Sequence, residues 1–319
     1  MEFFYDLSKC NLCPHNCNAD RSRQRNGFCK AGALTEIESY MPHYGEEPEL
    51  SGTKGSGTIF FSKCNMRCVY CQNYQISQES GKNNINNTII CDKEGLAKIM
   101  MELEGKGCHN INLVSPTIWA ANIIEALKHA GDRLRIPVVY NTGGYEKEQT
   151  IKMLKGLVQI YMPDMRYADN AFAGRYSDVG DYVKYNRQSV REMYEQVGNL
   201  VTDKNNIAVK GLIIRLLILP GNISEVKKSL DFIKNVLSDE VYISLMSQYH
   251  PLYRACDFPE LNRHINFKEY IDVIRYAEKL GFSNGSFQEF SGIRQPHEDP
   301  YTPDFSEKDI FGFSKENKE

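Results

Sequence analysis

The sequence has little net charge and lacks a long apolar run. Its 38 Lys and Arg residues against 41 Asp and Glu residues give a formal net charge of −3, so no basic surplus favours binding to nucleic acid or to an anionic membrane. No stretch approaches the roughly 18 consecutive apolar residues that a membrane-spanning helix needs. The first residues, Met1 to Leu7, lack the basic start and apolar core of a secretory signal. We therefore expect a cytoplasmic protein without nucleic-acid or membrane partners.

Several common sequence signatures are also missing. The chain contains no internal repeat, no low-complexity tract, and no Walker or dinucleotide-binding fingerprint. The segment 52–57 is rich in glycine, but it precedes a predicted strand instead of joining a strand to a helix. That position disfavours a phosphate-binding loop. Hydrophobic residues make up 41% of the chain, which is enough for a sizeable core.

Cysteine is the residue type that stands out. Ten cysteines in a long chain without a secretory signal indicate metal binding more than disulfides. Seven of them fall in two clusters: Cys10, Cys13, Cys17 and Cys29, and then Cys64, Cys68 and Cys71. We expect the remaining three, Cys91, Cys108 and Cys256, to be buried, unreactive thiols.

The second cluster reads Cys64-Asn-Met-Arg-Cys68-Val-Tyr-Cys71. Its three thiolates are one short of the four that normally hold a 4Fe–4S cluster, which leaves one iron open to another ligand. An alternative is a zinc knuckle completed by a distant His or Cys. The aromatic residue before the last cysteine and the position of the loop after a predicted strand both favour the iron–sulfur cluster.

The first cluster has the spacing Cys10-x2-Cys13-x3-Cys17-x11-Cys29. Four thiolates suit either a second 4Fe–4S cluster or a closed tetrahedral zinc site. The segment has little hydrophobic periodicity, so we expect a small lobe that folds because metal ligands hold it. We assign residues 1–56 to this lobe and a connector, in which 36–56 resembles a hairpin.

From residue 57 the pattern alternates between strands and helices. Predicted strands cover 58–61, 111–114, 137–141, 158–162, 211–219 and 241–246. Predicted helices cover 94–103, 121–130, 146–157, 187–197, 224–237 and 267–280. Six strand–helix units imply a parallel sheet with right-handed crossovers. Because Ser115, Asn141 and Asp164 follow or close strands, we expect a partial (β/α)6 TIM-like barrel over 57–290, followed by a C-terminal tail over 291–319.

The three-cysteine loop after the first barrel strand resembles the radical S-adenosylmethionine (radical SAM) superfamily. This resemblance implies a 4Fe–4S cluster on Cys64, Cys68 and Cys71 whose fourth iron is chelated by SAM. It also implies an electron donor such as flavodoxin or ferredoxin, and reductive cleavage of SAM to methionine and a 5′-deoxyadenosyl radical that abstracts hydrogen from a substrate. Tyr70, at the aromatic position of the motif, would pack against the adenine ring.

Further segments are similar to the pyruvate formate-lyase activating enzyme-like branch whose substrate is not generally assigned. These segments are 10–14, 43–48, 55–73, 109–117 and 246–251. The Gly-Gly-Glu element of the family is replaced by Ser115-Pro116-Thr117, whose backbone carbonyls would accept from the SAM ammonium. Asp164 would approach the amino or ribose end, and Arg166 would pair with the SAM carboxylate. Asn141 is a weaker candidate for a SAM contact.

The resemblance leaves the substrate open. We expect an enzyme that acts on a small molecule or a peptide, and no catalytic side chain is assigned beyond the cluster. One alternative is a glycyl radical enzyme activase, which acts on a partner protein. Another is a non-catalytic iron–sulfur electron carrier, which would need four protein ligands for each cluster.

Overall fold

The computed structural model describes residues 6–23, 26–78, 88–290, 303–305 and 310. The chain forms two compact units. The first unit contains Met1–Met66, Asn87–Pro163 and Lys184–Ile213, and the second contains Arg67–Asn86, Asp164–Val183 and Ile214–Glu319. The predicted tail, 291–319, lies almost entirely outside the described residues.

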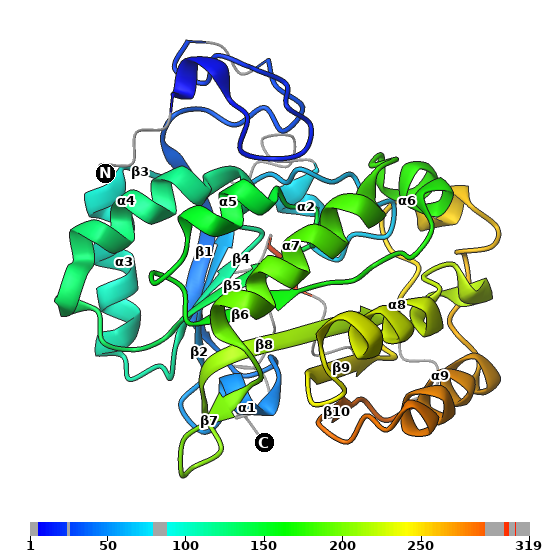
Figure 1. Ribbon diagram of the computed structural model, residues 1–319. Coiled ribbons are helices and arrows are strands. Elements are labelled where there is room, and N and C mark those ends of the chain that lie inside the picture. The colour runs from blue at the N-terminus through cyan, green and yellow to red at the C-terminus, as the bar shows by residue number, and fades with distance from the viewer. Residues whose placement is uncertain (1–5, 24–25, 79–87, 291–302, 306–309, 311–319) are drawn as a thin grey trace, which may run out of the picture. The chain divides into compact units, whose positions relative to one another are not determined.

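The sheet of the first unit is mostly parallel (Figure 1). Its strands are β1 (Thr35–His43), β2 (Ser56–Phe61), β3 (Ile89–Cys91), β4 (Ile111–Val114), β5 (Val138–Thr142), β6 (Ile160–Pro163), β7 (Val201–Thr202) and β8 (Ala208–Leu217), of which β8 continues into the second unit. The order is β3-β1-β2-β4-β5-β6-β8. Strands β2, β4, β5, β6 and β8 run parallel, whereas β1 pairs antiparallel with β2 and β3, and β7 pairs antiparallel with β8. Every residue of β2, β4, β5 and β6 is buried, as expected for parallel strands covered on both faces.

Helices of the first unit cover this sheet. They are α1 (Pro48–Ser51), α3 (Lys93–Gly105), α4 (Ala120–Ala130), α5 (Glu148–Met153) and α7 (Tyr182–Val197), with short 3-10 turns η1 (Leu7–Lys9), η2 (Thr117–Trp119) and η3 (Gly131–Arg133). Helix α3 begins after Asp92, whose carboxylate accepts from the backbone N–H groups of Glu94 and Gly95. Figure 1 shows α3 and α4 side by side, and both bury an apolar face.

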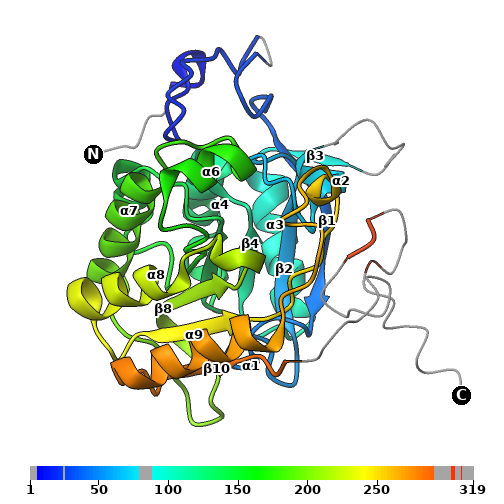
Figure 2. The same ribbon diagram turned by 90° about the vertical axis from the view of Figure 1, so that its right-hand side faces the viewer.

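The second unit holds the end of β8 together with β9 (Tyr242–Met246) and β10 (Gly285–Phe287), which pair in parallel. Its helices are α2 (Tyr74–Ser77), α6 (Asn170–Ser177), α8 (Val226–Phe232) and α9 (Phe267–Leu280), with the turns η4 (Pro220–Asn222), η5 (Ile233–Leu237) and η6 (Ala255–Asp257). Helix α9 has a reciprocal capping box between Asn266 and Glu269. It lies beside α8 (Figure 2).

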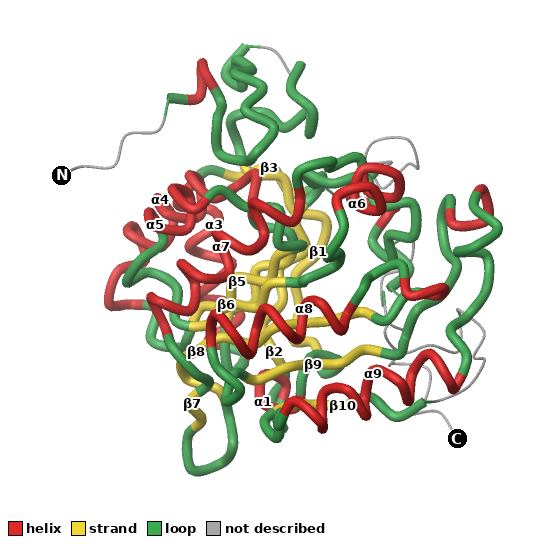
Figure 3. Tube along the Cα trace, turned by 45° about the vertical axis from the view of Figure 1, so that its right-hand side comes forward, coloured by secondary structure: helices red, strands yellow, loops and turns green. Residues whose placement is uncertain are grey.

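The N-terminal lobe of the first unit, described over residues 6–23 and 26–33, has almost no regular secondary structure in those residues. Figure 3 shows the lobe as loops with one helical turn, η1. Leu12 and Cys10 pack against Ala120 and Ala121 at the start of α4. The side chain of Thr150 donates to the carbonyl of Leu12 over 2.6 Å. The lobe is therefore held by its own turns and by contacts with α4 and α5.

The predicted fold class is confirmed. Five parallel strands, β2, β4, β5, β6 and β8, follow one another in the strand order, and that order has two ends, β3 and β10, so the sheet is open in the manner of a partial barrel. The segment 36–56 does not form a hairpin by itself: β1 pairs antiparallel with β2, the predicted first barrel strand, and a helical turn, α1, lies between them. Strands β3, β7 and β10 were not among the six predicted strands. No helix in the described parts of the chain is long and apolar enough to span a bilayer.

Three sequence predictions need correction. The helix predicted over 146–157 is shorter, because α5 ends at Met153 and Gly156 adopts a positive φ of 80°. The helix predicted over 224–237 changes to a π-helix after Phe232. Cys256 lies exposed in η6 instead of buried, while Cys108 is buried and Cys91 is partly buried.

Candidate functional site

Strand β2 leads directly into the cysteine loop. After Phe61, the carbonyl of Ser62 accepts from the indole N–H of Trp119 over 3.0 Å. Lys63, with a φ of 67°, pairs with Glu36. These contacts pin the chain immediately before Cys64. The first cysteine of the loop therefore stands at the carboxyl end of a buried parallel strand, where barrels of this class place their chemistry.

In the first unit, Cys64 and its neighbour Asn65 are tied to two other segments. The side-chain amide of Asn65 donates to the backbone carbonyl of Tyr145 over 2.6 Å. The backbone carbonyl of Asn65 lies 2.8 Å from Nε2 of His15. The His15 ring stacks on Phe28 at 3.7 Å. Because His15 follows Cys13 by two residues and Phe28 precedes Cys29, the N-terminal lobe contacts the first part of the cysteine loop.

The four N-terminal cysteines share one lobe. Burial raises the pKa of Cys13, and Cys29, Cys10 and Cys17 lie close enough to add to the rise. A Cβ on Gly27 would lie 3.1 Å from Sγ of Cys17, so the backbone approaches this sulfur closely.

Among the described residues, no three His, Cys, Asp or Glu side chains converge on the position of a single metal ion. The chemistry of the donor set, four thiols on one small lobe, still fits a thiolate-bound metal centre.

The rest of the cysteine loop, from Arg67 on, belongs to the second unit and forms backbone hydrogen bonds there. The N–H of Arg67 donates to the carbonyl of Ser177 over 3.0 Å, and the N–H of Val69 donates to the carbonyl of Tyr176 over 2.9 Å. On another side, the N–H of Arg254 donates to the carbonyl of Val69 over 2.8 Å. The rings of Tyr74 and Tyr253 stack at 4.9 Å. The loop is thus fixed between the end of α6 and the segment that contains Arg254.

Two serine hydroxyls face the sulfurs of this part of the loop. Ser177 donates to Sγ of Cys68 over 3.0 Å, and Oγ of Ser77 lies 3.2 Å from Sγ of Cys71. Burial raises the pKa of Cys71 to about 11, with a further contribution from Cys68. A buried thiolate needs a metal or strong donors to exist at neutral pH. The buried Cys68 and the partly buried Cys71, each with a hydroxyl partner, fit the ligands of an iron–sulfur cluster.

Asp164 forms ion pairs with Arg166 and Arg215 in the second unit. Tyr70 lies close to Arg166. Asp164 follows β6 and its carboxylate binds both arginines, at 2.6 Å from Nη2 of Arg166 and 2.8 Å from Nε of Arg215. Burial alone would lower the pKa of Arg166, but Asp164, with Cys68 and Tyr70 beyond it, raises that pKa well above its ordinary value. The guanidinium of Arg166 therefore faces the cysteine loop. Its buried Nε has no hydrogen-bond partner among the described residues.

Ser115 and Asn141 meet in the first unit, at the carboxyl ends of β4 and β5. The N–H of Ser115 donates to the carbonyl of Asn141 over 2.9 Å. Ser115 has a φ of 59°, which is uncommon for a residue other than glycine. Such strained positions concentrate at functional sites. The structure thus brings this predicted pair together, in a different unit from Tyr70, Asp164 and Arg166.

Glu146 is a buried carboxyl group at the same strand ends that the sequence reasoning missed. Its Oε1 accepts hydrogen bonds from Thr117 and Thr142, each over 2.5 Å, while its buried Oε2 has no partner within the described residues. Burial raises the pKa of Glu146 to about 7. A signal was available, because Gly143-Gly144-Tyr145-Glu146 directly follows β5.

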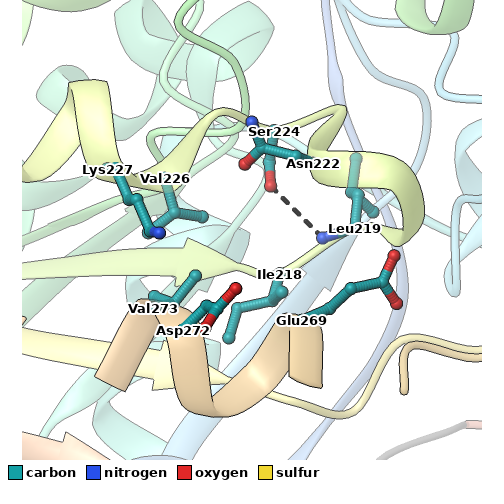
Figure 4. A pocket seen from close by; sticks show the side chains of 9 residues that line it. All are labelled: Ile218, Leu219, Asn222, Ser224, Val226, Lys227, Glu269, Asp272 and Val273. Carbon is teal, nitrogen blue, oxygen red and sulfur yellow. Dashed lines mark hydrogen bonds between the residues drawn. The ribbon is translucent and has the colours of Figure 1, made fainter. Parts of the chain in front are cut away.

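A cavity of about 270 Å³ lies elsewhere in the second unit (Figure 4). The residues that line it come from the end of β8, the turn η4, and helices α8 and α9: Ile218, Leu219, Asn222, Ser224, Val226, Lys227, Glu269, Asp272 and Val273. Its most prominent charge, Glu269, already accepts from the N–H of Gly221 and pairs with Arg263. None of the predicted site residues lines this cavity.

One protein is similar to this chain over most of its length. It is the uncharacterized protein MJ0674 of Methanocaldococcus jannaschii, which is 31% identical over 279 residues that cover 86% of this chain and 75% of that protein. No family model matches the chain.

Several solved structures resemble part of the chain. Streptococcus suis SuiB, solved bound to S-adenosylmethionine, is 12% identical over 71% of this chain with a TM-score of 0.49, and the chain spans 48% of its length. Methylornithine synthase (PylB) is 16% identical over 68% of this chain and 59% of its own, with a TM-score of 0.45. A domain of pyruvate-formate lyase-activating enzyme from Bacteroides vulgatus is 12% identical over 62% of this chain and 91% of its own, with a TM-score of 0.36.

Proposed function

The chain belongs to the same family as the uncharacterized protein MJ0674 of Methanocaldococcus jannaschii, and from its own residues we propose that it is a radical SAM enzyme. One observation carries the proposal: the CxxxCxxC loop stands at the carboxyl end of the buried strand β2, with a hydroxyl donor, Ser177, on the sulfur of Cys68 and the hydroxyl of Ser77 at 3.2 Å from the sulfur of Cys71. Cys64, Cys68 and Cys71 would hold a 4Fe–4S cluster there, and such a cluster, once reduced by an external electron donor, would supply the electron for reductive cleavage of SAM to methionine and a 5′-deoxyadenosyl radical that abstracts hydrogen from a substrate.

The residues of the chain have separate roles in this proposal. Cys64, Cys68 and Cys71 would hold the cluster. In the second unit, the unused Nε donor of Arg166 supports its role as the partner of the SAM carboxylate, and Asp164 orients that guanidinium. Tyr70 would pack against the adenine ring of SAM.

In the first unit, Ser115 and Asn141 would contact SAM. The carboxyl of Glu146, bonded to Thr117, is an additional polar group at the strand end where the Gly-Gly-Glu element of the superfamily is absent.

We extend the proposal to the N-terminal lobe, where Cys10, Cys13, Cys17 and Cys29 would hold a second 4Fe–4S cluster. The close approach of Gly27 to the Cys17 sulfur and the mutual influence of the four thiols support a metal centre here. Zinc is the other metal that four thiolates accept. Metal analysis of the purified protein distinguishes the two.

The substrate we propose is a small molecule or a peptide, and the electron donor is a flavodoxin or ferredoxin in the cytoplasm. A protein substrate, as for a glycyl radical enzyme activase, is a distinct outcome. Electron paramagnetic resonance (EPR) of the enzyme mixed anaerobically with a candidate partner would then show a glycyl radical doublet.

The test of the proposed function is SAM cleavage by the anaerobically reconstituted and reduced protein, with 5′-deoxyadenosine quantified by mass spectrometry. Cys68→Ala should abolish the product, whereas Cys108→Ala, which removes a buried thiol outside both clusters, should not. Equal product from the Cys68→Ala variant would overturn the assignment. If the wild-type cluster is intact and reducible but its EPR spectrum ignores SAM and no product forms, the protein is an electron carrier instead.

A further inference from the structure

The end of helix α6 is docked onto the cysteine loop in the second unit. The carbonyls of Tyr176 and Ser177 accept from the backbone N–H groups of Val69 and Arg67, respectively, so the last residues of the helix run beside the loop. This pairing brings the Ser177 side chain to Cys68 although 109 positions separate them in the sequence. The contact therefore depends on backbone hydrogen bonds as well as on the serine side chain.

The Ser177 hydroxyl belongs to a chain of hydrogen bonds that ends on a ligand sulfur. Tyr70 donates to the hydroxyl of Tyr167 over 2.6 Å, the hydroxyls of Tyr167 and Ser177 lie 2.7 Å apart, and Ser177 donates to Sγ of Cys68 over 3.0 Å. All four residues are buried, with exposed fractions between 0% and 5%. No water is needed to complete this chain.

The donors along the chain agree with the number of protons. Each hydroxyl has one proton to donate. Tyr70 donates to Tyr167 and Ser177 donates to Cys68, so the proton of Tyr167 is the one available for its contact with Ser177. A hydrogen bond of this kind is strongest when the sulfur that accepts it is a metal-bound thiolate.

We propose that Ser177 is a positioning residue that raises the reduction potential of the iron–sulfur cluster held by Cys64, Cys68 and Cys71, and that Tyr167 orients it. The inference rests on the proposed function. Hydrogen bonds to ligand sulfurs are among the factors that set the potential of such clusters. The reduced cluster carries one more negative charge than the oxidised cluster. A donor on the sulfur therefore stabilises the reduced form more and makes the cluster easier to reduce.

The other two contacts with sulfurs of the loop are less suited to a test by substitution. Ser77 lies 3.2 Å from Sγ of Cys71, and either atom can be the donor. The N–H of Met66 reaches Sγ of Cys64 over 3.4 Å, and a side-chain substitution does not remove it. Ser177 is thus the contact whose removal gives a defined change in charge stabilisation.

The test is an EPR-monitored redox titration of the reconstituted protein without SAM. Ser177→Ala should shift the midpoint potential to a more negative value, with up to tenfold less reduced cluster at a given potential, which corresponds to about 59 mV for one electron. Tyr167→Phe should shift it in the same direction by less. Ser189→Ala is the control, because this buried hydroxyl donates to the carbonyl of Asn186 and belongs to the other unit.

The outcomes separate this inference from the proposed function. If wild type cleaves SAM and the midpoint potentials of Ser177→Ala and Ser189→Ala both equal that of wild type, the role of Ser177 is overturned while the proposed function stands. If wild type assembles no cluster that cleaves SAM, the proposed function itself fails. If Ser177→Ala assembles no cluster, the midpoint potential of Tyr167→Phe is compared with that of wild type instead. An unchanged potential in Tyr167→Phe overturns the inference.

Discussion

Replacing Glu146 by glutamine should change how the stability of the first unit depends on pH. The pKa of the Glu146 carboxyl is raised from 4.5 to about 7, chiefly by burial. Between these values the unfolded chain releases the proton while the folded chain keeps it, so wild type loses stability as the pH rises through this window. The two pKa values differ by about 2.5, which at about 1.4 kcal/mol per pKa unit corresponds to a loss of about 3.5 kcal/mol. Glutamine has no proton to lose and avoids this cost.

The measurement is the free energy of unfolding in urea at several pH values. The chain has one tryptophan, Trp119, which is fully buried in the same unit as Glu146, so its fluorescence follows the unfolding of that unit. Relative to Glu146→Gln, wild type should lose about 2 kcal/mol between about pH 5.5 and about pH 8.5. The larger part of the cost above pH 5.5 falls before about pH 7, where the folded carboxyl ionises.

Glu269 provides a control, because its pKa is shifted in the opposite direction from that of Glu146. A hydrogen bond from Arg263 lowers the pKa of Glu269 to about 2. Its stabilisation is present above the unfolded value of 4.5 and is lost only as the pH falls toward 2. Glu269→Gln should therefore cost a constant amount over the same pH range, as followed by circular dichroism. Parallel pH profiles for wild type and Glu146→Gln would refute the reasoning, since they would mean that Glu146 ionises normally.

Two further substitutions test the metal lobe and the SAM contact. Gly27→Ala places a Cβ 3.1 Å from Sγ of Cys17 and 3.0 Å from Cβ of Ala19, so it should lower the metal content of the purified protein by up to one cluster, whereas Gly105→Ala has open space around its Cβ and should not. Equal metal content in both, by mass spectrometry, would contradict the assignment of the lobe. Arg166→Lys keeps the charge but loses the planar guanidinium, so SAM should bind about tenfold more weakly. Arg175→Lys, at an exposed ion pair with Glu260, should leave SAM binding unchanged, and equal binding by the two variants would count against the role of Arg166.

Elements with complete local signals were predicted to within a residue or two. Strand β4 matches its predicted range, and α9 does so as well because Asn266 caps its start and Gly281, with a φ of 90°, ends it. The three-residue β3 and two-residue β7 are too short to leave a pattern. Helix α5 was overestimated because apolar spacing continues beyond Met153, where Gly156 turns the backbone.

The candidate site divides in the same way between local and distant signals. The cysteines, Asp164 and Arg166 could be identified from the sequence because their chemistry lies in short runs of adjacent residues. Ser177 and Glu146 were missed because a serine or glutamate has no characteristic spacing of its own. Their significance depends on the fold, which brings Ser177 to Cys68 across 109 positions and Glu146 to Thr117 across 29.

Two features of the second unit meet at the sulfur of Cys68. Asp164 binds two guanidinium groups, those of Arg166 and Arg215, and all three side chains are largely buried. Cys68 is among the groups that raise the pKa of Arg166, so this guanidinium lies close enough to the sulfur for their charges to interact. Ser177 donates a hydrogen bond to the same sulfur over 3.0 Å. A cluster ligand must be a thiolate, and a nearby cation and a hydroxyl donor are neighbours that stabilise a negative sulfur.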